Sequence, residues 1–238
     1  MQLFYNSQIT TKDKQFTFDK IESRHIIKVL RKKEGDSLYI TNGKGFLFIA
    51  KISIANDKNC VITINSVEEK KKSFNYNLHI AIAPTKNNDR FEWFLEKATE
   101  IGIDEITPTI CSRSERKVVK LERMQKIIES AAKQSLKYHF PKLNQPIAYS
   151  DFINQNFNSQ LFIAHCEDEQ HRNSFEKALE LQKDVTIFIG PEGDFTFQEI
   201  KKAIENKFIP ITLGKSRLRT ETAGIVAAHT VYLLNSLK

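Results

Sequence analysis

Two loops rich in glycine and charged residues hold the groups of this chain that are best suited to chemistry. They are Ile189–Phe195, with the sequence IGPEGDF, and Leu213–Ala223, with the sequence LGKSRLRTETA. In the first loop, glycines on both sides of Pro191-Glu192 let the backbone approach a ligand closely, while the proline keeps the turn rigid. In the second loop, four consecutive polar side chains, Arg219 to Thr222, crowd donors and acceptors at an expected helix start. Both loops therefore have the composition of ligand-binding loops.

Each loop also has a plainer explanation. The first could be a tight turn, and the second could be a capped helix start with charged residues on its surface. However, each loop follows a predicted strand, Val185–Ile189 for the first and Ile209–Leu213 for the second. Ligands of open α/β sheets bind beyond the carboxyl ends of the strands. Two such loops at two strand ends therefore favour a ligand site over two unrelated turns.

The region after residue 73 is expected to form an α/β domain, because predicted strands and helices alternate along it. The strands are expected at Leu78–Ala83, Glu105–Ile110, Gln160–His165, Val185–Ile189 and Ile209–Leu213. The helices are expected at 91–101, 121–135, Phe197–Asn206 and about Thr222–Leu234. Thr196 and Glu199 have the spacing of a capping box for the third of these helices. The last helix is apolar almost all round and is expected to be buried.

The N-terminal part of the chain is expected to be a separate small β-barrel. A charged break, EEKKKS at 68–73, marks its end. Before the break, strands are expected at Ser37–Thr41, Phe46–Ile54 and Cys60–Val67, with one short helix at about Ser23–Leu30. Residues 1–73 hold 14 Lys/Arg against 8 Asp/Glu, so most of the chain's net charge of +7 lies there. Nucleic acid is the leading explanation of this charge, and a generic basic surface is the alternative.

Several function classes lack their signatures in this sequence. It contains no G-x-x-x-x-G-K-[ST], no G-x-G-x-x-G and no G-x-S-x-G, which argues against a P-loop NTPase, a Rossmann enzyme and an α/β-hydrolase. Its six histidines and three cysteines have no metal-ligand spacing, so no metal is expected. Cys60, Cys111 and Cys166 are far apart and are expected to be reduced and buried. With no signal-like or membrane-spanning apolar run, a cytoplasmic protein is expected.

Further motifs occur in a fixed order along the whole chain. They are HIIKVLR at 25–31 with Gly35-Asp36, Pro84-Thr85-Lys86 with RFEWFLEKATEIG at 90–102, SAAKQS at 130–135 with Pro141, and the two loops described above. In this order they resemble the 16S rRNA uridine-N3 methyltransferases (the RsmE type) of the SPOUT class. The motif LRTETA at 218–223 is the most diagnostic part.

The resemblance implies a fold, a reaction and partners. The fold would be a PUA-like β-barrel over residues 1–70 that binds RNA, followed by an α/β SPOUT domain over 74–238 with a trefoil-knotted parallel sheet. The reaction would be methylation of N3 of a uridine in 16S rRNA, at position 1498 in rRNA numbering, with S-adenosylmethionine as the methyl donor. The partners would be the rRNA or the assembled small ribosomal subunit, and a second copy of the chain. The dimer is expected to be built around the last helix and the first helix after residue 73.

The resemblance also assigns site residues to positions of this chain. The expected cofactor-binding residues are Ala164, His165, Ile189, Gly190, Pro191, Glu192, Gly193, Leu213, Gly214, Ser216, Leu218, Arg219, Thr220, Thr222 and Ala223. The loop after Gln160–His165 should supply a third wall. The family often has Gly-Gly where this chain has Gly193-Asp194, and Pro-Arg-Ile-Leu-Arg where it has residues 215–219. The second difference leaves open whether Ser216 or Arg217 faces the site.

Three residues are candidates for the chemical step. Uridine N3 carries a proton that must leave, and Glu221 is the first candidate for the base, with Glu192 second. Arg219 could stabilise the negative charge that develops on the uracil carbonyl oxygens. The plainer alternative is that Glu221 and Arg219 form a structural ion pair.

A set of basic residues is expected to contact RNA phosphates. It comprises Arg24, Lys28, Arg31, Lys32, Arg113, Arg116, Lys126, Lys133 and Lys137. The last three are expected on one side of a helix, for which a solvated face is the alternative. Lys137 stands where the family commonly has an arginine. Two other classes stay open: an RNA-binding module without catalysis, and a methyltransferase of tRNA or of another rRNA site.

Overall fold

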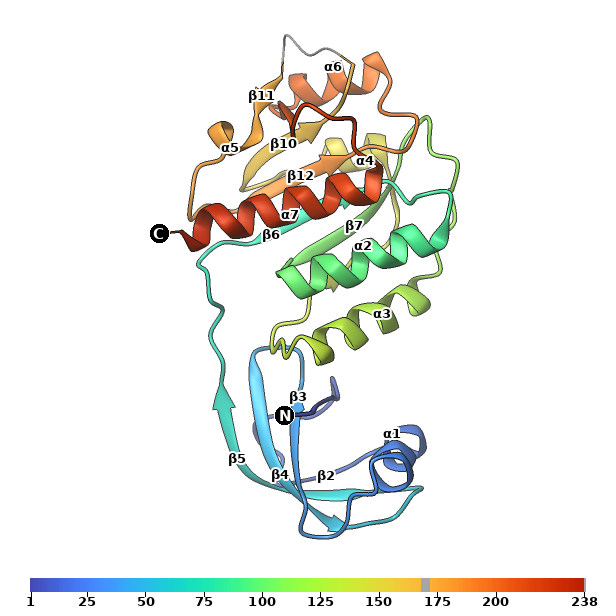
Figure 1. Ribbon diagram of the computed structural model, residues 1–238, viewed down its shortest axis with the longest axis vertical. Helices are drawn as coiled ribbons and strands as arrows, with labels where there is room; N and C mark the ends of the chain where they lie inside the picture. The colour runs from blue at the N-terminus through green and yellow to red at the C-terminus, as the bar shows by residue number, and fades with distance from the viewer. Residues whose placement is uncertain (168–171, 238) are drawn as a thin grey trace. The chain divides into compact units, whose positions relative to one another are not determined.

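The chain folds into two compact units, one at each end of the sequence (Figure 1). The computed structural model describes residues 1–167 and 172–237. The N-terminal unit comprises Met1–Ser73 together with Ala132–Phe140, and the C-terminal unit comprises Phe74–Ala131 and Pro141–Lys238. The segment Ala132–Phe140 was expected in the second domain. Backbone hydrogen bonds join it to the N-terminal unit, from Gly45 N to Tyr138 O at 2.8 Å and from Phe140 N to Gly43 O at 2.9 Å.

The N-terminal unit is a curled five-stranded sheet with a short helical segment. Its strands are β1 (Leu3–Tyr5), β2 (Gln15–Thr17), β3 (Ser37–Thr41), β4 (Phe46–Ile54) and β5 (Val61–Glu69), in the order β1-β3-β4-β5-β2. All neighbours are antiparallel except β1 and β3. The register between β4 and β5 shifts twice, and such irregularities bend a strand. Apolar side chains such as Phe18, Ile26 and Phe48 fill the interior.

The predicted elements of this unit are largely confirmed. Strands β3 and β4 have the expected bounds, whereas β5 begins one residue and ends two residues later than expected. The expected helix is two pieces, α1 (Lys20–Arg24) and a π-helical segment, η1 (His25–Val29). The strands β1 and β2 were not predicted, because three residues are too few to show a period.

The C-terminal unit is built on a parallel sheet. Its strands are β6 (Leu78–Ile82), β7 (Glu105–Ile110), β8 (Lys142–Leu143), β9 (Ile147–Ala148), β10 (Gln160–Ala164), β11 (Asn173–Ser174), β12 (Val185–Ile189) and β13 (Ile209–Thr212). The order is β11-β13-β10-β12-β6-β7-β8, with β9 also paired to β7. Every neighbouring pair is parallel. The expected α/β class, with a separate small β-domain in front, is confirmed.

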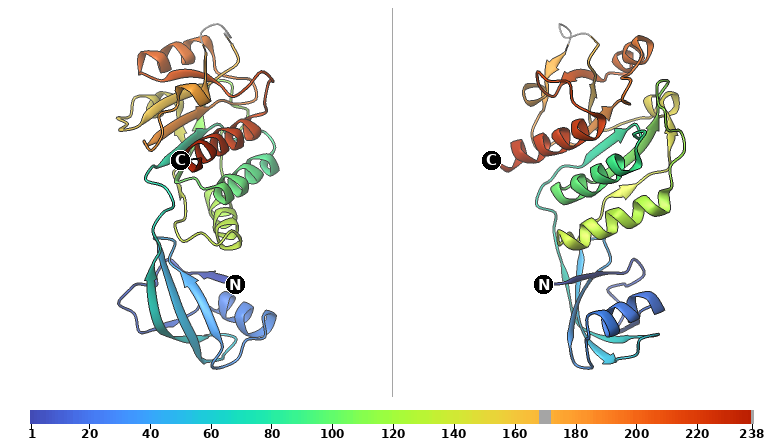
Figure 2. Two further views of the ribbon diagram at one scale, coloured as in Figure 1. Left: turned by 60° about the vertical axis from the view of Figure 1, so that its left-hand side comes forward. Right: turned by 45° about the vertical axis from the view of Figure 1, so that its right-hand side comes forward.

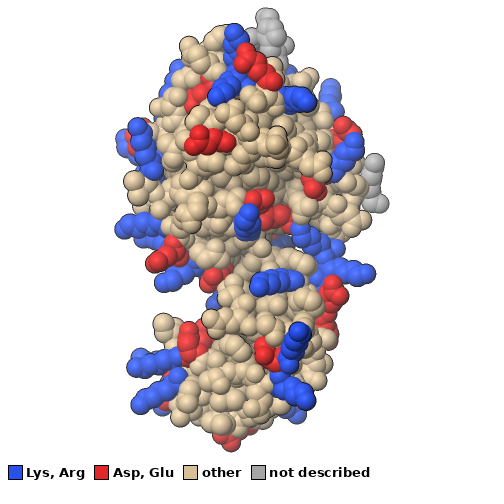
Figure 3. All heavy atoms as spheres, turned by 180° about the vertical axis from the view of Figure 1, so that it is seen from behind, with Lys and Arg blue, Asp and Glu red and all other residues tan. Residues whose placement is uncertain are grey.

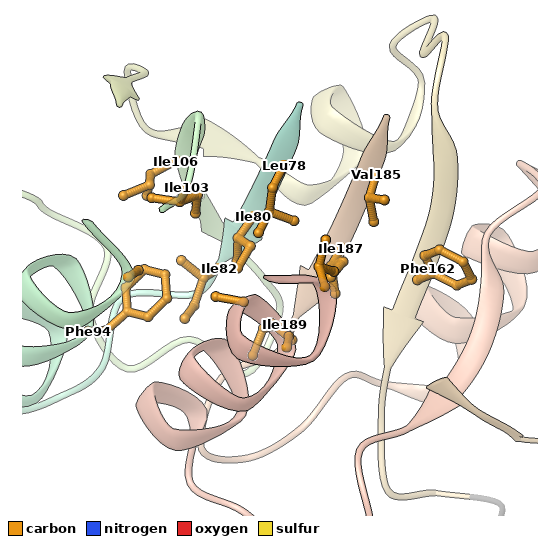
Figure 4. Close-up of a cluster of buried hydrophobic side chains, with 14 of the residues drawn as sticks. Leu78, Ile80, Ile82, Phe94, Ile103, Ile106, Phe162, Val185, Ile187 and Ile189 are labelled. Carbon is orange, nitrogen blue, oxygen red and sulfur yellow. The ribbon is translucent and has the colours of Figure 1, made fainter. Parts of the chain in front are cut away.

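Alternate side chains of the central strands enter two different cores. On β6 and β12, every second residue points to the side of Phe94, as Figure 4 shows for Leu78, Ile80, Ile82, Val185, Ile187 and Ile189. Of the residues between them, Ala81 and Phe188 enter a second cluster on the other face. Period-two burial of this kind on both faces is what a parallel sheet covered by helices requires.

The helices cover both faces of this sheet. They are α2 (Asn88–Ile101), α3 (Leu121–Gln134), α4 (Tyr149–Ile153), α5 (Phe175–Ala178), α6 (Phe197–Glu205) and α7 (Thr220–Ser236). The capping box predicted for α6 is confirmed, because Thr196 Oγ1 accepts from Glu199 N and the Glu199 side chain accepts from Thr196 N. In Figure 2, α2 and α7 lie side by side on one face. No helix in the described part of the chain is both long and apolar enough to cross a bilayer.

The expectation that the last helix is buried holds for one side of it only. One side of α7 is buried, with Gly224, Ala227 and Val231 against the sheet and α2. The opposite side is exposed, with 37% of Tyr232 and 42% of Leu233 accessible to solvent. The uniform apolar pattern therefore reflects one packed face and one apolar face that is open in the isolated chain.

Candidate functional site

A cavity of about 280 Å³ lies beyond the carboxyl ends of three neighbouring strands of the C-terminal unit. The strands are β13, β10 and β12, which are adjacent in the sheet although they are not consecutive in sequence. Parallel pairing puts their carboxyl ends at one edge, so the loops that follow them meet there. This arrangement brings together the two loops singled out in the sequence and the end of the strand expected to supply a third wall.

Most of the expected cofactor-binding residues line this cavity. They are Ala164, His165, Ile189, Gly190, Pro191, Glu192, Leu213, Gly214, Ser216, Leu218, Arg219, Thr220 and Ala223. Among the residues that the structure describes, Gly193 and Thr222 belong to the same loops but are not part of the lining. The sequence left open whether Ser216 or Arg217 faces the site, and in the structure both residues line the cavity.

Several lining residues were not expected from the sequence. They are Cys166, Arg172, Asp194, Ile211 and Thr212. Most of them neighbour expected residues, and strand-end position is the signal that could have found them. The loop predicted as the third wall is only partly visible, because residues 168–171 lie outside the described part of the chain.

A buried hydrogen bond joins the two principal loops. The hydroxyl of Thr220 donates to the carbonyl oxygen of Gly190 at 3.0 Å, and Thr220 is 5% exposed. Thr220 is the first residue of α7, and Gly190 directly follows β12. The start of α7 is therefore fixed to the end of the neighbouring strand, which defines one corner of the cavity.

Glu192 presents a carboxylate oxygen that has no hydrogen-bond partner in the described part of the chain. Its Oε1 accepts from the backbone N–H of Lys86 at 2.9 Å, which ties the loop after β12 to the loop after β6. Its Oε2 is buried and, among the described residues, has no hydrogen-bond partner. Because Glu192 lines the cavity and leaving a buried polar atom unpaired is unfavourable, this oxygen is suited to accept a hydrogen bond or a proton from a bound molecule.

Glu221 also has a buried carboxylate oxygen, Oε2, without a hydrogen-bond partner among the described residues, but it lies in a different place. It is 6% exposed, and its Oε1 is 3.8 Å from Nε of Arg90 on α2. Glu221 therefore pairs with Arg90, and the alternative pair with Arg219 does not occur among the ion pairs of the described residues. Among the described residues Glu221 is not part of the cavity lining, whereas Arg219, the N-cap residue of α7, is exposed and does line it.

Asp194 occupies a backbone conformation that explains the glycine common in the family. Its φ is 61°, in the left-handed region where aspartate is tolerated better than most residues. Its two carboxylate oxygens accept from the backbone N–H groups of Phe195 and Cys166, both at 2.8 Å. The second bond reaches from the loop after β12 to the loop after β10. Asp194 therefore adopts the left-handed conformation that this position requires, and its side chain links the loop after β12 to the loop after β10.

Cys166 departs from the expectation that all three cysteines are buried. Cys60 and Cys111 are buried, but Cys166 is exposed. Desolvation raises the pKa of the Cys166 thiol, and the neighbouring Asp194 carboxylate raises it further. The thiol therefore remains protonated at neutral pH. No cluster of three or more His, Cys, Asp or Glu side chains suited to a metal occurs among residues 1–167 and 172–237.

The basic residues expected to contact RNA differ in their exposure to solvent and in their bonds to other groups of the protein. Arg24, Lys28 and Arg31 are exposed on or beside α1 and η1, although Lys28 Nζ is 3.7 Å from Asp57, and Lys32 is half-buried. Arg116 donates to the carbonyl oxygens of Thr85 and Lys86 at 3.0 and 2.5 Å. Arg113 is engaged in a similar way with the loop after β12.

The prediction that three lysines share one helical side is wrong. Lys126 and Lys133 lie on α3, but the helix ends at Gln134 and Leu136 takes a left-handed conformation with φ 55°. Lys137 therefore follows the helix, and burial lowers its pKa. The sequence did not predict this helix end, because the turn that follows Gln134 contains no glycine or proline.

Comparisons with known proteins assign a type to each region. A model described as an RNA methyltransferase domain matches residues 72–232, and one described as an RNA methyltransferase PUA domain matches residues 18–65. Ribosomal RNA small subunit methyltransferase E of Rickettsia conorii is 30% identical over 99% of this chain and 96% of its own length.

Solved structures resemble the whole chain. A probable rRNA-methyltransferase from Porphyromonas gingivalis is 39% identical, with a TM-score of 0.91 over 100% of this chain and 99% of its own. Ribosomal RNA small subunit methyltransferase E from Neisseria gonorrhoeae, crystallised with S-adenosylmethionine, is 25% identical, with a TM-score of 0.86 over 98% of each chain. Both units therefore have counterparts in solved proteins.

Proposed function

The chain belongs to the ribosomal RNA small subunit methyltransferase E family of RNA methyltransferases, and on that premise we propose that it methylates N3 of one uridine in 16S rRNA. By resemblance this is uridine 1498 in rRNA numbering. The methyl donor is S-adenosylmethionine, with which the Neisseria gonorrhoeae relative was crystallised. The observation that carries the proposal is the cavity formed by the loops after β10, β12 and β13.

The residues around the cavity fit S-adenosylmethionine. Apolar walls from Ile189, Leu213 and Leu218 suit a nucleobase. The exposed guanidinium of Arg219 suits a carboxylate. When bound, the cofactor supplies an electrophilic methyl group on a sulfonium.

The chain's own residues would then handle the uridine. N3 lies on the Watson–Crick edge, so the base must be unpaired or turned out of a helix before it can react. Glu192 would accept the N3 proton through Oε2, and Arg219 would stabilise negative charge on the uracil carbonyl oxygens. Glu221 would hold the start of α7 through Arg90. The geometry thus favours Glu192 over Glu221 as the base.

The family also implies finer features that we include in the proposal. Residues 1–70 would form the PUA-like RNA-binding domain, and residues 74–238 would form a SPOUT domain whose chain passes through a trefoil knot. Arg24, Lys28, Arg31 and Lys32 would contact rRNA phosphates. The open apolar side of α7, with Tyr232, Leu233 and Leu237, would pack against a second copy, together with α2.

The reaction can be tested with purified components. The protein is incubated with S-adenosylmethionine and either 16S rRNA, assembled small subunits or tRNA, and the RNA is digested and examined for 3-methyluridine by mass spectrometry. The proposal expects 3-methyluridine from 16S rRNA, free or assembled, and none from tRNA. Methylation of tRNA alone would make this an enzyme with another substrate. Cofactor binding without methylation of any RNA would favour a binding module.

A further inference from the structure

We infer that Arg113 is a positioning residue of the cavity, holding the backbone after β12 and the loop after β10 in the arrangement that binds the cofactor. The inference rests on the proposed function, since it concerns the same cavity. Arg113 follows β7 and does not itself line the cavity in the described part of the chain. The sequence suggested another role for it, an RNA phosphate contact.

One nitrogen of Arg113 joins two loops. Its Nη1 donates to the carbonyl oxygens of Gly193 at 2.9 Å and Phe195 at 3.2 Å. The same nitrogen is 3.3 Å from Oε1 of Glu167. Gly193 and Phe195 follow β12, whereas Glu167 follows β10, the neighbouring strand. The guanidinium therefore links two walls of the cavity from outside.

The stem of the same side chain packs on the loop. A Cβ placed on Gly193 would lie 3.2 Å from Cβ and 3.5 Å from Cδ of Arg113. The first distance is shorter than an ordinary van der Waals contact between carbon atoms. The absence of a side chain at Gly193 thus lets the arginine stem lie against the backbone, while the head of the arginine binds the Gly193 carbonyl. This steric fit is independent of the hydrogen bonds.

The backbone that Arg113 holds carries a lining residue. Asp194 lies between the two carbonyls that Arg113 binds, and its carboxylate accepts from Cys166 N–H across the cavity edge. Asp194 and Cys166 both line the cavity. Releasing Gly193 and Phe195 would free this carboxylate to move, so the effect of Arg113 reaches the cofactor through Asp194.

The carbonyl contacts matter more than the ion pair. The side chains of Arg113 and Glu167 are 46% and 44% exposed, and exposed ion pairs contribute little. Nη1 already has three acceptors for two hydrogens. A phosphate bound through this nitrogen would have to displace backbone carbonyls, which argues against RNA contact as its main task.

Measurements of cofactor affinity and RNA affinity distinguish a positioning role of Arg113 from an RNA contact. We expect Arg113→Ala to weaken S-adenosylmethionine binding about tenfold by calorimetry, the loss expected for about one hydrogen bond. The KM for the cofactor should rise equally, while kcat at saturating cofactor stays within twofold. RNA affinity at saturating cofactor should not change. Arg113→Lys should recover part of the loss, because an ammonium can still donate to carbonyls. Glu167→Gln should have a small effect.

The matched control is Arg123→Ala, which removes an exposed arginine paired with Glu92 in the same unit. It should leave cofactor affinity unchanged. If Arg113→Ala binds the cofactor as the wild type does, the inference is wrong. It is also wrong if RNA affinity falls and cofactor affinity does not. If the alanine variant does not fold, Arg113→Lys must show the split between cofactor and RNA affinity. Failure of the wild-type protein to bind S-adenosylmethionine would instead reject the proposed function.

Discussion

Glu192 and Glu221 belong to the two loops whose residues are best suited to chemistry, but of the two only Glu192 is part of the cavity lining. Each has a buried oxygen without a hydrogen-bond partner among residues 1–167 and 172–237, but of the two only Glu192 lines the cavity. Glu221 is directed to Arg90 on α2, at 3.8 Å. In the proposed reaction the first acts on the uridine and the second stabilises the start of α7. Substitution by glutamine should separate these roles, because it removes the charge and keeps the shape.

We expect Glu192→Gln to lower the single-turnover rate about 100-fold or more at neutral pH, the usual contribution of a general base. Cofactor binding should persist, because the glutamine oxygen can still accept from Lys86 N–H. Raising the pH should restore part of the rate as uridine N3 ionises by itself. Glu221→Gln should mainly lower the melting temperature. Wild-type turnover in Glu192→Gln combined with a pH-dependent loss in Glu221→Gln would reverse the two assignments.

The bond between Thr220 and Gly190 should stabilise the fold measurably. Thr220→Val keeps the shape of the side chain but leaves the buried Gly190 carbonyl without its donor. We expect the free energy of unfolding to fall by about 1–3 kcal/mol, measured by urea denaturation. Thr220→Ser keeps the hydroxyl and is the control, with a smaller loss. Equal stability of the valine variant and the wild type would show that the carbonyl finds another donor.

For individual residues, the sequence predicted which ones line the cavity better than it predicted their hydrogen-bond and ion-pair partners. Strand ends and glycine loops located most of the lining, because those signals are local. The partner of Glu221 comes from α2, the carbonyl partners of Arg113 come from the loop after β12, and the distant partner of Asp194 comes from the loop after β10. Pairings between such distant segments leave no mark in composition or spacing, so the sequence could suggest an Arg219–Glu221 pair but not the pair with Arg90.

The packing of α7 on α2 depends on a glycine in the middle of a helix. Alanine normally stabilises a helix relative to glycine by about 1 kcal/mol. A Cβ at Gly224, however, would lie 2.6 and 2.7 Å from ring carbons of Phe94, which is fully buried. Overpacking of this kind costs about 1–3 kcal/mol and should outweigh the gain in propensity. The glycine thus sets the distance between two helices that carry Glu221 and Arg90.

We therefore expect Gly224→Ala to lower the free energy of unfolding, by up to about 2 kcal/mol net. Thermal or urea denaturation measures this loss. The double variant with Phe94→Val should recover part of what Gly224→Ala loses, because the smaller side chain leaves room for the methyl group. A more stable Gly224→Ala protein would mean that the helices separate without cost.

Elements with a clear period were predicted well from the sequence, and short ones were not. Strands such as β7 and β12 and the capping box of α6 have the expected positions. The two-residue strands β8, β9 and β11 have no period to detect and exist because longer neighbours pair with them. The π-helical turn of η1 is likewise a local rearrangement that apolar spacing does not distinguish from an α-helix.

For the molecule as a whole, charge is a weak guide to the RNA-binding surface. Lys and Arg side chains occur over the face shown in Figure 3, with Asp and Glu among them. The excess of positive charge in residues 1–73 was evident from counting. The use of Arg113 and Arg116 within the C-terminal unit was not, because it requires the positions of the loops they bind.

The exposed apolar side of α7 should be covered by a second copy. We expect light scattering at micromolar concentration to give the mass of a dimer, and Leu233→Glu to shift it towards the monomer by placing a charge in an apolar contact. Leu233 is 42% exposed in the isolated chain. Ile204→Glu, at an exposed position on α6, is the control and should remain dimeric. A monomeric wild-type protein would contradict this part of the proposal.

The central claim is that this chain places a methyl group on N3 of one uridine of 16S rRNA, and nucleoside mapping of rRNA from a deletion strain tests it most directly. Mass spectrometry of 16S rRNA fragments should show one 3-methyluridine in the parent strain and an unmodified uridine there in the deletion strain. The wild-type gene should restore the modification, and a gene carrying Glu192→Gln should restore much less of it. An unchanged 3-methyluridine in the deletion strain, or a loss confined to another RNA, would contradict the account.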